Sequence, residues 1–471
     1  MTKPQGAGRS AGTTAPTKAG QSEEPSARKV PGLVLAWLPP GLLSHDRAPI
    51  DSLLVVGRSS GARWCIPDDR LSRTHFDVRL VHDRLLLQDL GSRNGTWADG
   101  ARLTAPREVE PGTVIRAGGC VFVLVRELGA LAPPGDESGR SFGMAGQFHT
   151  GPLVKRLRVA ARTGRHVLIE GETGVGKELA AQALHRLFAE AGRRGTLLSH
   201  NAARFAGEDD AVTTLFGVSR GAFTGVEPRP GAIELATGGT LFLDEVHNLP
   251  ARVQRSLLRF VEDGRFQRVG EPAPRTVDVR LVLGTNLPVA QAADEGRLAH
   301  DLVARLHRVS LPPLRERRAD VPAILSEVVR RRLPPAVADA VLGCLDAPVW
   351  ERLCRHDFSR GNVREIEDLV SVAGARIAEG EGPPAAVAST LAEALPANDD
   401  PKPAHVGAAD HSPYERHREA ILAAFHDADG NLTRLEELLR SQGWRFNRRW
   451  LTVYLERWGV RSVRRRSEPS R

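Results

Sequence analysis

The stretch Gly171-Glu-Thr-Gly-Val-Gly-Lys-Glu178 has the glycine spacing of a phosphate-binding loop, with a lysine, Lys177, directly after the last glycine. An apolar run, residues 167–169, precedes it, and a helical pattern, residues 179–188, follows it. Inward-facing N–H groups, a helix N-terminus and the lysine charge would together surround phosphate oxygens, which favours nucleotide binding over a plain strand-to-helix turn. The expected nucleotide ligands are Gly171, Glu172, Thr173, Gly174, Val175, Gly176, Lys177 and Glu178.

The composition is typical of a globular protein with several domains. A length of 471 residues predicts about three domains. Four cysteines show neither a CxxC pair nor metal-ligand spacing, so we expect neither a disulfide framework nor a zinc site. Residues 1–29 are rich in Gly, Ser, Thr and Pro without an apolar signal segment, and no later run approaches a membrane span. A disordered N-terminus and a cytoplasmic protein with no membrane partner are expected.

Residues 30–127 contain short alternating segments separated by turn signals, which predicts a small β-sandwich. Three of its loops carry Gly57-Arg58-Ser59, Leu71-Ser-Arg-Thr-His75 and Ser92-Arg-Asn-Gly-Thr96. In this order they resemble the forkhead-associated (FHA) domain, whose signature is GR, then SRxH, then NGT. Residues 128–141, with a Pro-Pro-Gly cluster, are expected to be a linker.

The FHA resemblance implies that these loops bind a phosphothreonine peptide, on a phosphorylated protein or a Ser/Thr kinase. It implies that Arg58 and Arg73 contact the phosphate, that Ser72 adds a hydroxyl donor and that Asn94 holds the peptide backbone. Charge-assisted donors on a preformed loop suit a phosphate. His75 is expected to brace the loop from inside rather than contact ligand.

From residue 142 to residue 378, apolar runs alternate with helical stretches, which predicts an α/β domain with a mainly parallel sheet. The run Gly239-Thr-Leu-Phe-Leu-Asp-Glu245 reads as a buried strand that ends in two carboxylates, because a surface strand would alternate. Asp244 could hold Mg²⁺ through its water shell, and Glu245 could orient or deprotonate the attacking water. Another apolar strand ends at Asn286, where an amide could sense a γ-phosphate.

Five stretches of this central region stand out: GETGVGKE, LFGVSRGAFTGV, GGTLFLDE, LLRFVEDGRFQRVG and LPPLRERRADVP. With them the region resembles the AAA+ ATPase domain, with helical lid, of bacterial enhancer-binding proteins, which remodel RNA polymerase carrying sigma-54. It implies ATP hydrolysis with Mg²⁺ in a homo-oligomeric ring. By the same resemblance Asn201 restrains Glu245, Asn286 is the first sensor and Arg364 the second. The implied sigma-54 contact is the loop of Gly221, Ala222, Phe223, Thr224, Gly225 and Val226.

The sequence departs from this family at three places. Leu298-Ala-His-Asp-Leu-Val-Ala-Arg305 stands where the family has FRxDLxxR, so Ala299 replaces the first arginine and Arg305 remains as the candidate arginine finger. Residues 356–360, before Gly361-Asn-Val-Arg-Glu365, differ from the usual approach to that motif. Val226 replaces the alanine that ends the sigma-54 loop in the family.

The C-terminal part is expected to bind DNA. Residues 379–412 are rich in Ala and Pro and are interpreted as a flexible linker. Residues 413–466 show helical patterns with an apolar stripe, and residues 442–471 carry nine arginines against two glutamates, a net charge of +7. The arrangement resembles a Fis-type helix-turn-helix, with a solvated basic tail as the alternative. The expected DNA contacts are Arg445, Arg448, Arg449 and Thr452.

Together these patterns predict a multidomain chain: an FHA-like β-sandwich, an α/β AAA+ ATPase with a helical lid, and a small all-α helix-turn-helix. The favoured function is an ATP-dependent activator of sigma-54 RNA polymerase that binds an upstream DNA site and is controlled by phosphothreonine recognition. One alternative is a remodelling ATPase that phosphopeptides recruit to a target other than sigma-54. A phosphopeptide scaffold with a decayed ATPase is disfavoured because Lys177, Asp244 and Glu245 are intact.

Overall fold

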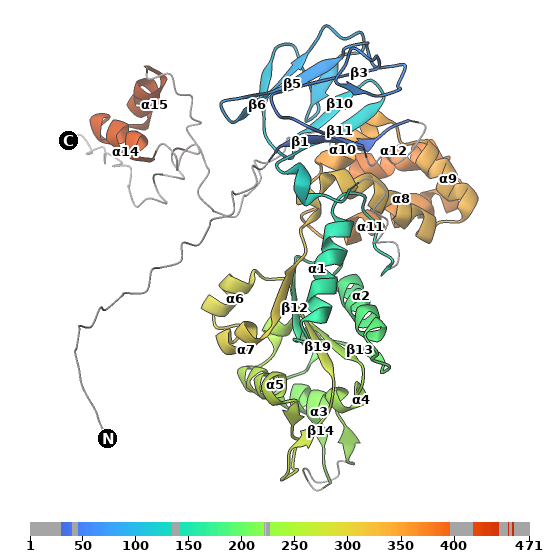
Figure 1. The fold of residues 1–471 in the computed structure, drawn as a ribbon, viewed down its shortest axis with the longest axis vertical. Coiled ribbons are helices and arrows are strands. Elements are labelled where there is room, and N and C mark those ends of the chain that lie inside the picture. Colours follow the sequence, from blue (N-terminus) through green and yellow to red (C-terminus); the bar gives the residue numbers. More distant parts are fainter. Residues whose placement is uncertain are drawn as a thin grey trace, which may run out of the picture. The chain divides into compact units, whose positions relative to one another are not determined.

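The structure, a computed structural model, describes residues 30–39, 46–133, 142–220, 222, 227–395, 418–441, 451 and 455 (Figure 1). The chain divides into two compact units, residues 1–399 and residues 400–471. Across the described ranges, no helix has both the length and the apolar character that a membrane crossing requires.

The first part of the larger unit is the predicted β-sandwich, whose strand pairs are antiparallel except for β3 with β4. Its sheets have the orders β2-β1-β11-β10-β7-β8 and β4-β3-β5-β6-β9. Alternate apolar side chains, among them Leu35, Phe76 and Phe122, fill the space between them. The strands are β1 (Gly32–Trp37), β2 (Arg47–Pro49), β3 (Leu53–Gly57), β4 (Trp64–Cys65), β5 (Phe76–Val81), β6 (Arg84–Asp89), β7 (Thr96–Ala98), β8 (Ala101–Arg102), β9 (Arg107–Val109), β10 (Val114–Ala117) and β11 (Cys120–Val125).

The start of the segment expected to be a linker, residues 128–141, is packed. A short 3-10 helix, η1 (Leu128–Ala130), follows β11, and Leu131 and Ala132 are buried. Arg47 Nη1 donates to the carbonyl oxygens of Leu128 and Leu131, at 3.2 Å each. Residues 134–141 lie outside the described part of the chain.

The second part is the predicted α/β domain, built on a parallel sheet of order β13-β16-β19-β12-β20. The sheet strands are β12 (Val167–Glu170), β13 (Leu197–Asn201), β16 (Thr240–Asp244), β19 (Arg280–Thr285) and β20 (His307–Ser310). The helices are α1 (Thr150–Arg162), α2 (Lys177–Glu190), η3 (Ala202–Arg204), α3 (Glu208–Phe216), α4 (Ala232–Leu235), η4 (Val246–Asn248), α5 (Ala251–Asp263), α6 (Val289–Asp294) and α7 (His300–Arg305). Two small ribbons are β14 (Gly217–Val218) with β15 (Arg229–Pro230), and β17 (Arg265–Phe266) with β18 (Arg275–Thr276).

Helices cover both faces of this sheet, which explains why its strands read as continuous apolar runs. Val167, Ile169 and Val282 pack with residues of α1 and α2 on one face. Leu168 and Leu283 pack with residues of α3 to α7 on the other. Figure 1 shows α1 and α2 on the side of the sheet opposite to α6 and α7.

A helical lid follows the sheet and extends beyond its predicted end at residue 378. Its elements are η5 (Leu314–Glu316), η6 (Arg318–Asp320), α8 (Val321–Arg332), α9 (Pro335–Gly343), α10 (Ala347–Arg355), α11 (Val363–Ala378) and α12 (Pro383–Ala394). Helix α12 contradicts the flexible linker predicted from residue 379. Its Val387 and Leu391 join the lid core, so the alanine-rich composition reflects a buried helix here rather than a tether.

In the smaller unit, the described residues form helices α14 (Arg418–Asp427) and α15 (Leu432–Ser441). Ile421, Phe425 and Leu435 share one apolar cluster with Leu451 and Leu455. The four residues expected to contact DNA, Arg445, Arg448, Arg449 and Thr452, lie outside the described residues.

The packing of α12 predicts that two truncations behave differently. A chain ending at Gly382 should be less stable than a chain ending at Leu395 by about 5 kcal/mol, because burial of Val387, Leu391 and Leu395 is lost at roughly 1.5–3 kcal/mol each. Urea unfolding monitored by the fluorescence of buried Trp350 would measure the difference. If the two truncated chains had equal free energies of unfolding, residues 383–394 would belong to the linker and not to the folded lid.

Candidate active site and phosphopeptide loops

The phosphate-binding loop joins β12 to α2, as the sequence predicts. Gly174 and Gly176 adopt φ values of +73° and +108°, a region that L side chains rarely enter. Lys177, the first residue of α2, is only 7% exposed, and its Nζ donates to the carbonyl oxygens of Gly171 (2.9 Å) and Glu172 (3.3 Å). Burial lowers the pKa of Lys177, while the carboxylates of Asp244 and Glu245 act against that shift.

The carboxyl ends of the neighbouring strands meet at the edge of the sheet beside this loop. Asp244 is the last residue of β16, and its Oδ1 accepts from Glu245 N at 2.9 Å. A Cβ on Gly284 of β19 would come within 2.5 Å of that Oδ1, so glycine leaves room for the carboxylate. Glu245 has φ +54°, a strained left-handed conformation for a residue with a side chain, and such strain is typical of functional positions.

Glu245 contacts a residue that sequence analysis did not identify. Asn248 Nδ2 donates to Glu245 Oε2 at 3.3 Å, from the 3-10 helix η4 that follows the strand. Asn201, which was expected to restrain Glu245, accepts instead from Ala203 N at 2.8 Å and caps η3. Restraint of Glu245 by Asn201 until the nucleotide state changes therefore stays a prediction.

Asn286, the expected first sensor, lies one residue after β19. Its Nδ2 is 3.4 Å from Thr173 Oγ1 of the phosphate-binding loop. Its buried Oδ1 has no hydrogen-bond partner among the described residues. A buried amide oxygen without a partner is costly. The amide of Asn286 thus contacts the loop that would hold phosphates through its nitrogen.

The lid closes directly on the phosphate-binding loop. Val363 N, at the start of α11, donates to Gly174 O at 3.1 Å. A Cβ on Gly174 would lie 1.8 Å from Gly361 O, so this approach requires a glycine. Asn362, 1% exposed with φ +51°, donates from Nδ2 to Thr173 O at 3.0 Å and accepts at Oδ1 from Leu314 N at 2.9 Å.

Two arginines between the sheet and the lid also hold the loop, and sequence analysis did not single them out. Arg315 forms a two-pronged ion pair with Glu172, at 2.8 and 2.6 Å, and holds the pKa of that carboxyl below its usual value. Arg317, buried, donates from Nη2 to Val175 O at 3.0 Å. Both belong to the stretch LPPLRERRADVP, which marked the region without indicating which guanidinium faces the loop.

The phosphate-binding loop, the strand ends and the lid line a cleft of about 340 Å³. This volume is within the usual range for a small-molecule site. Residues from the loop, β16, α8 and α11 line it, including Lys177, Asp244, Arg317 and Arg364. Loop glycines, a buried ammonium and helix N-termini fit an anionic nucleotide. Across the described ranges, no group of three or more His, Cys, Asp or Glu is placed to hold a metal ion.

Arg305, the candidate finger, is absent from the lining of this cleft. It ends α7, its side chain is 61% exposed, and its Nε lies 3.1 Å from Glu262 Oε1. Its role as an arginine finger stays a prediction.

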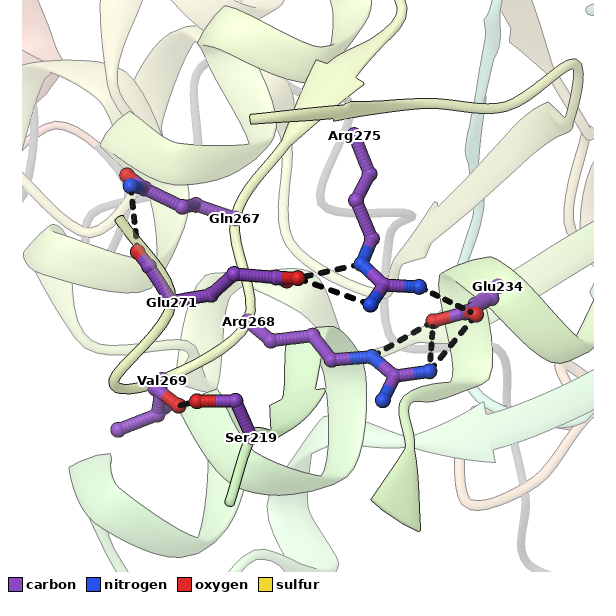
Figure 2. Close-up of polar contacts among 7 residues, drawn as sticks. All are labelled: Ser219, Glu234, Gln267, Arg268, Val269, Glu271 and Arg275. Carbon is purple, nitrogen blue, oxygen red and sulfur yellow. Dashed lines mark hydrogen bonds and ion pairs between the residues drawn. The ribbon is translucent and has the colours of Figure 1, made fainter. Parts of the chain in front are cut away.

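Hydrogen bonds and ion pairs hold the residues next to the segment expected to contact sigma-54. Ser219 donates from N and Oγ to Val269 O at 2.9 Å (Figure 2). In the same view Glu234 pairs with Arg268 at 2.6 Å and with Arg275 at 3.1 Å. Of the six predicted contact residues, Ala222 is described, half-buried against Gly270. The others, Gly221, Phe223, Thr224, Gly225 and Val226, lie outside the described residues.

The three FHA loops interlock at one end of the sandwich. Arg58 N donates to Ser72 O at 3.0 Å, and Ser72 Oγ accepts from Arg93 N at 3.0 Å. Asn94 Nδ2 donates to Arg70 O at 2.6 Å. The predicted ligands Arg58, Ser72, Arg73 and Asn94 thus lie in one cluster.

The bracing role of His75 is confirmed. It is fully buried, its Nδ1 accepts from Ser72 N at 2.9 Å, and its Nε2 lies 3.0 Å from Gly95 O. Acceptance at Nδ1 places the proton on Nε2, which donates to that carbonyl oxygen. Burial lowers the pKa of His75, which favours the neutral ring that this arrangement uses.

Comparisons with known proteins match the two largest domains. Residues 147–312 match the family model "Sigma-54 interaction domain", and residues 54–118 match "FHA domain". A crystal structure of NtrX from Brucella abortus in complex with ADP covers 66% of this chain and 68% of its own, with 27% identity and a TM-score of 0.42.

Relatives among curated proteins are transcription regulators. The nitric oxide reductase transcription regulator NorR1 of Cupriavidus necator is 41% identical over 52% of this chain and 46% of its own length. The transcriptional regulatory protein ZraR of Klebsiella oxytoca is 35% identical over 64% of this chain and 67% of its own length. The chain spans about half the length, or less, of the first relatives that it matches. It belongs to the bacterial enhancer-binding proteins that carry a sigma-54 interaction domain, and it has an FHA domain before that domain.

Proposed function

We propose that this protein is an ATP-dependent activator of sigma-54 RNA polymerase whose activity is controlled by phosphothreonine recognition. The observation that carries the proposal is the cleft in which the phosphate-binding loop, the carboxylate end of β16 and the lid converge. Family membership supports the polymerase as the target.

Each cleft residue has a role that follows from its position. With nucleotide bound, Lys177 would neutralise phosphate charge and Asp244 would hold magnesium. Glu245, adjacent in the chain, orients or deprotonates the attacking water. Asn286 contacts the loop through its amide nitrogen, and Arg364 lines the cleft from the lid, so both can report the nucleotide state. When bound, ATP with Mg²⁺ supplies the phosphoryl group and the charge that polarises it.

The exposure of Arg305 supports the proposed ring, which the family resemblance implies. An arginine supplied by a neighbouring subunit stabilises charge on a transferring phosphoryl group. In this proposal Arg305 leaves Glu262 and enters the cleft of the next copy of the chain. The smaller unit, with its basic C-terminal segment, holds the ring at DNA upstream of the promoter.

Shared active sites predict a specific pattern of activity among variants. Lys177→Ala should impair ATP binding, whereas Glu245→Ala and Arg305→Ala should keep binding and lower turnover by about 10³-fold or more. Mixing the last two variants should exceed the turnover of either alone, because some interfaces then receive both intact residues. Arg252→Ala, which removes another exposed, ion-paired arginine, is the matched control and should retain turnover. No gain in any mixture would argue against a finger supplied in trans.

Phosphopeptide binding predicts a charge-dependent affinity. Arg58→Ala should weaken binding of a phosphothreonine peptide at least tenfold, because a lost charge-assisted contact costs roughly 1.5–3 kcal/mol. Arg84→Ala, on β6 and 70% exposed, should leave it unchanged. Calorimetry with phosphorylated and plain threonine peptides measures both. A parent protein that does not prefer the phosphorylated peptide would refute this part of the proposal.

Contact with sigma-54 predicts capture in a trapped state. In the motif Gly221-Ala-Phe-Thr-Gly-Val226, Phe223 would offer apolar area and Thr224 a hydroxyl to the partner. With an ATP transition-state analogue, the parent protein should form a stable complex with sigma-54, and Thr224→Ala should not. Val226→Ala, which restores the family residue, should bind at least as well as the parent. Failure of both the parent and Val226→Ala would favour a remodelling ATPase with another target.

A further inference from the structure

One sheet of the FHA domain is buried on both of its faces. Leu33, Leu35 and Phe122 point into the sandwich core, whereas their neighbours Val34 and Val123 belong to a different cluster. That second cluster contains lid residues, Trp350 among them. Antiparallel sheets commonly leave one face to water and then alternate apolar with polar residues. The runs GLVLAW of β1 and CVFVLV of β11 do not alternate, so the sequence itself indicates a second covered face.

The lid supplies the cover. Trp37 at the end of β1 packs on Trp350 of α10, with ring centroids 6.1 Å apart, and these side chains are 7% and 2% exposed. Val321, Ile324 and Leu325, from α8, belong to the same cluster.

A buried ion pair fixes the register of this contact. Arg116 Nε of β10 lies 2.6 Å from Glu351 Oε2 of α10, and the two side chains are 14% and 5% exposed. Glu351 Oε1 also accepts from Gly100 N of the FHA domain at 2.8 Å. Removal of one partner would leave the other charge buried without compensation. The two side chains must therefore stay in contact, which fixes how the FHA domain and the lid pack together.

The same arginine touches the phosphopeptide end of the sandwich. The Arg116 guanidinium carbon lies 3.7 Å from the ring centroid of Trp97, close enough for a cation–π contact. Trp97 follows the Asn-Gly-Thr loop, and a Cβ on Gly95 would lie 3.3 Å from its ring. Arg116 therefore connects a loop expected to bind phosphothreonine with a lid carboxylate.

The opposite end of the connection reaches the nucleotide cleft. Arg318 Nη1 of η6 donates to Gly112 O, in the turn before β10, at 3.0 Å. Three residues earlier, Arg315 holds Glu172 of the phosphate-binding loop. One short segment thus contacts the FHA domain and the phosphate-binding loop.

We infer that the outer face of the sheet β2-β1-β11-β10-β7-β8 is a docking surface whose partner is this chain's own lid, and that Trp97, Arg116 and Glu351 couple the phosphopeptide loops to the ATPase. The docking is independent of the proposed function, whereas the coupling rests on phosphothreonine binding. Linkage between two binding sites is reciprocal. If the bound peptide changes the affinity for nucleotide through the lid, then bound nucleotide changes the affinity for the peptide by the same factor.

The chain's own cysteines provide the test of docking. Cys354 lies in the cluster shared with the FHA domain, one helical turn after Glu351, and burial raises its pKa to about 12. Cys120 lies in the sandwich core, and Cys65 is exposed. In the full-length chain, thiol labelling followed by mass spectrometry should modify Cys65 quickly and the two buried cysteines slowly, because the thiolate is the reactive form.

Weakening the Arg116–Glu351 ion pair should expose Cys354 of the lid but not Cys120 of the sandwich core. Glu351→Gln and Arg116→Ala should each speed labelling of Cys354 at least tenfold while Cys120 stays protected, which shows that the sandwich remains folded. Glu108→Ala, which removes an exposed partner of Arg84 on the other sheet, should change neither rate. Labelling of Cys354 in the parent as fast as Cys65, or no acceleration in both interface variants, would overturn the docking.

The coupling has a separate readout. A phosphothreonine peptide that binds the full-length chain should change the Cys354 labelling rate and the ATPase rate in the parent, and neither rate in Arg116→Ala. A bound peptide that changes neither rate in the parent would overturn the coupling and leave phosphopeptide recognition standing. A peptide that does not bind would refute both recognition and coupling, while the docking is still decided by the labelling rates without peptide.

Discussion

The lid and the phosphate-binding loop touch at a point that admits no side chain. The carbonyl oxygen of Gly361 lies where a Cβ on Gly174 would stand, and Asn362 donates to the loop from the adjacent position. This contact makes the nucleotide cleft a joint product of the sheet and the lid, because loop, strand ends and lid helices must all be in place together. A change in the conformation of the phosphate-binding loop would therefore alter its contact with the start of α11.

The lid also packs against the FHA domain, so one helical layer contacts both the β-sandwich and the phosphate-binding loop. On one side, Arg315 and Arg317 hold the phosphate-binding loop. On the other, Arg318 and Glu351 hold turns and strands of the sandwich. The buried Arg116–Glu351 pair tolerates little displacement, because a separated partner is left in a low-dielectric environment. In the coupling that we infer, the lid carries a change at the FHA domain to the nucleotide cleft.

Local sequence patterns predicted the parts of the structure that depend on neighbouring residues. Glycine spacing predicted the phosphate-binding loop, the apolar run before Asp244 predicted a buried strand, and His75 was assigned to the interior of its loop. Contacts between distant residues were not predicted. Gly100 and Glu351 are 251 positions apart, and Glu172 and Arg315 are 143 apart, so no local pattern links them. Helix α12 was missed because alanine and proline are common in linkers, although Pro at a helix start and alanine within it also suit a helix.

In the proposed function, ATP turnover in this cleft opens promoters for sigma-54 polymerase. Permanganate footprinting of a purified sigma-54 polymerase on duplex promoter DNA measures this directly, since single-stranded thymines become reactive when the promoter melts. Reactive thymines should appear only when the full-length protein and hydrolysable ATP are both present, and none should appear with a non-hydrolysable analogue. Melting without hydrolysis, or no melting on any sigma-54 promoter under conditions in which the protein hydrolyses ATP, would refute the proposed activation.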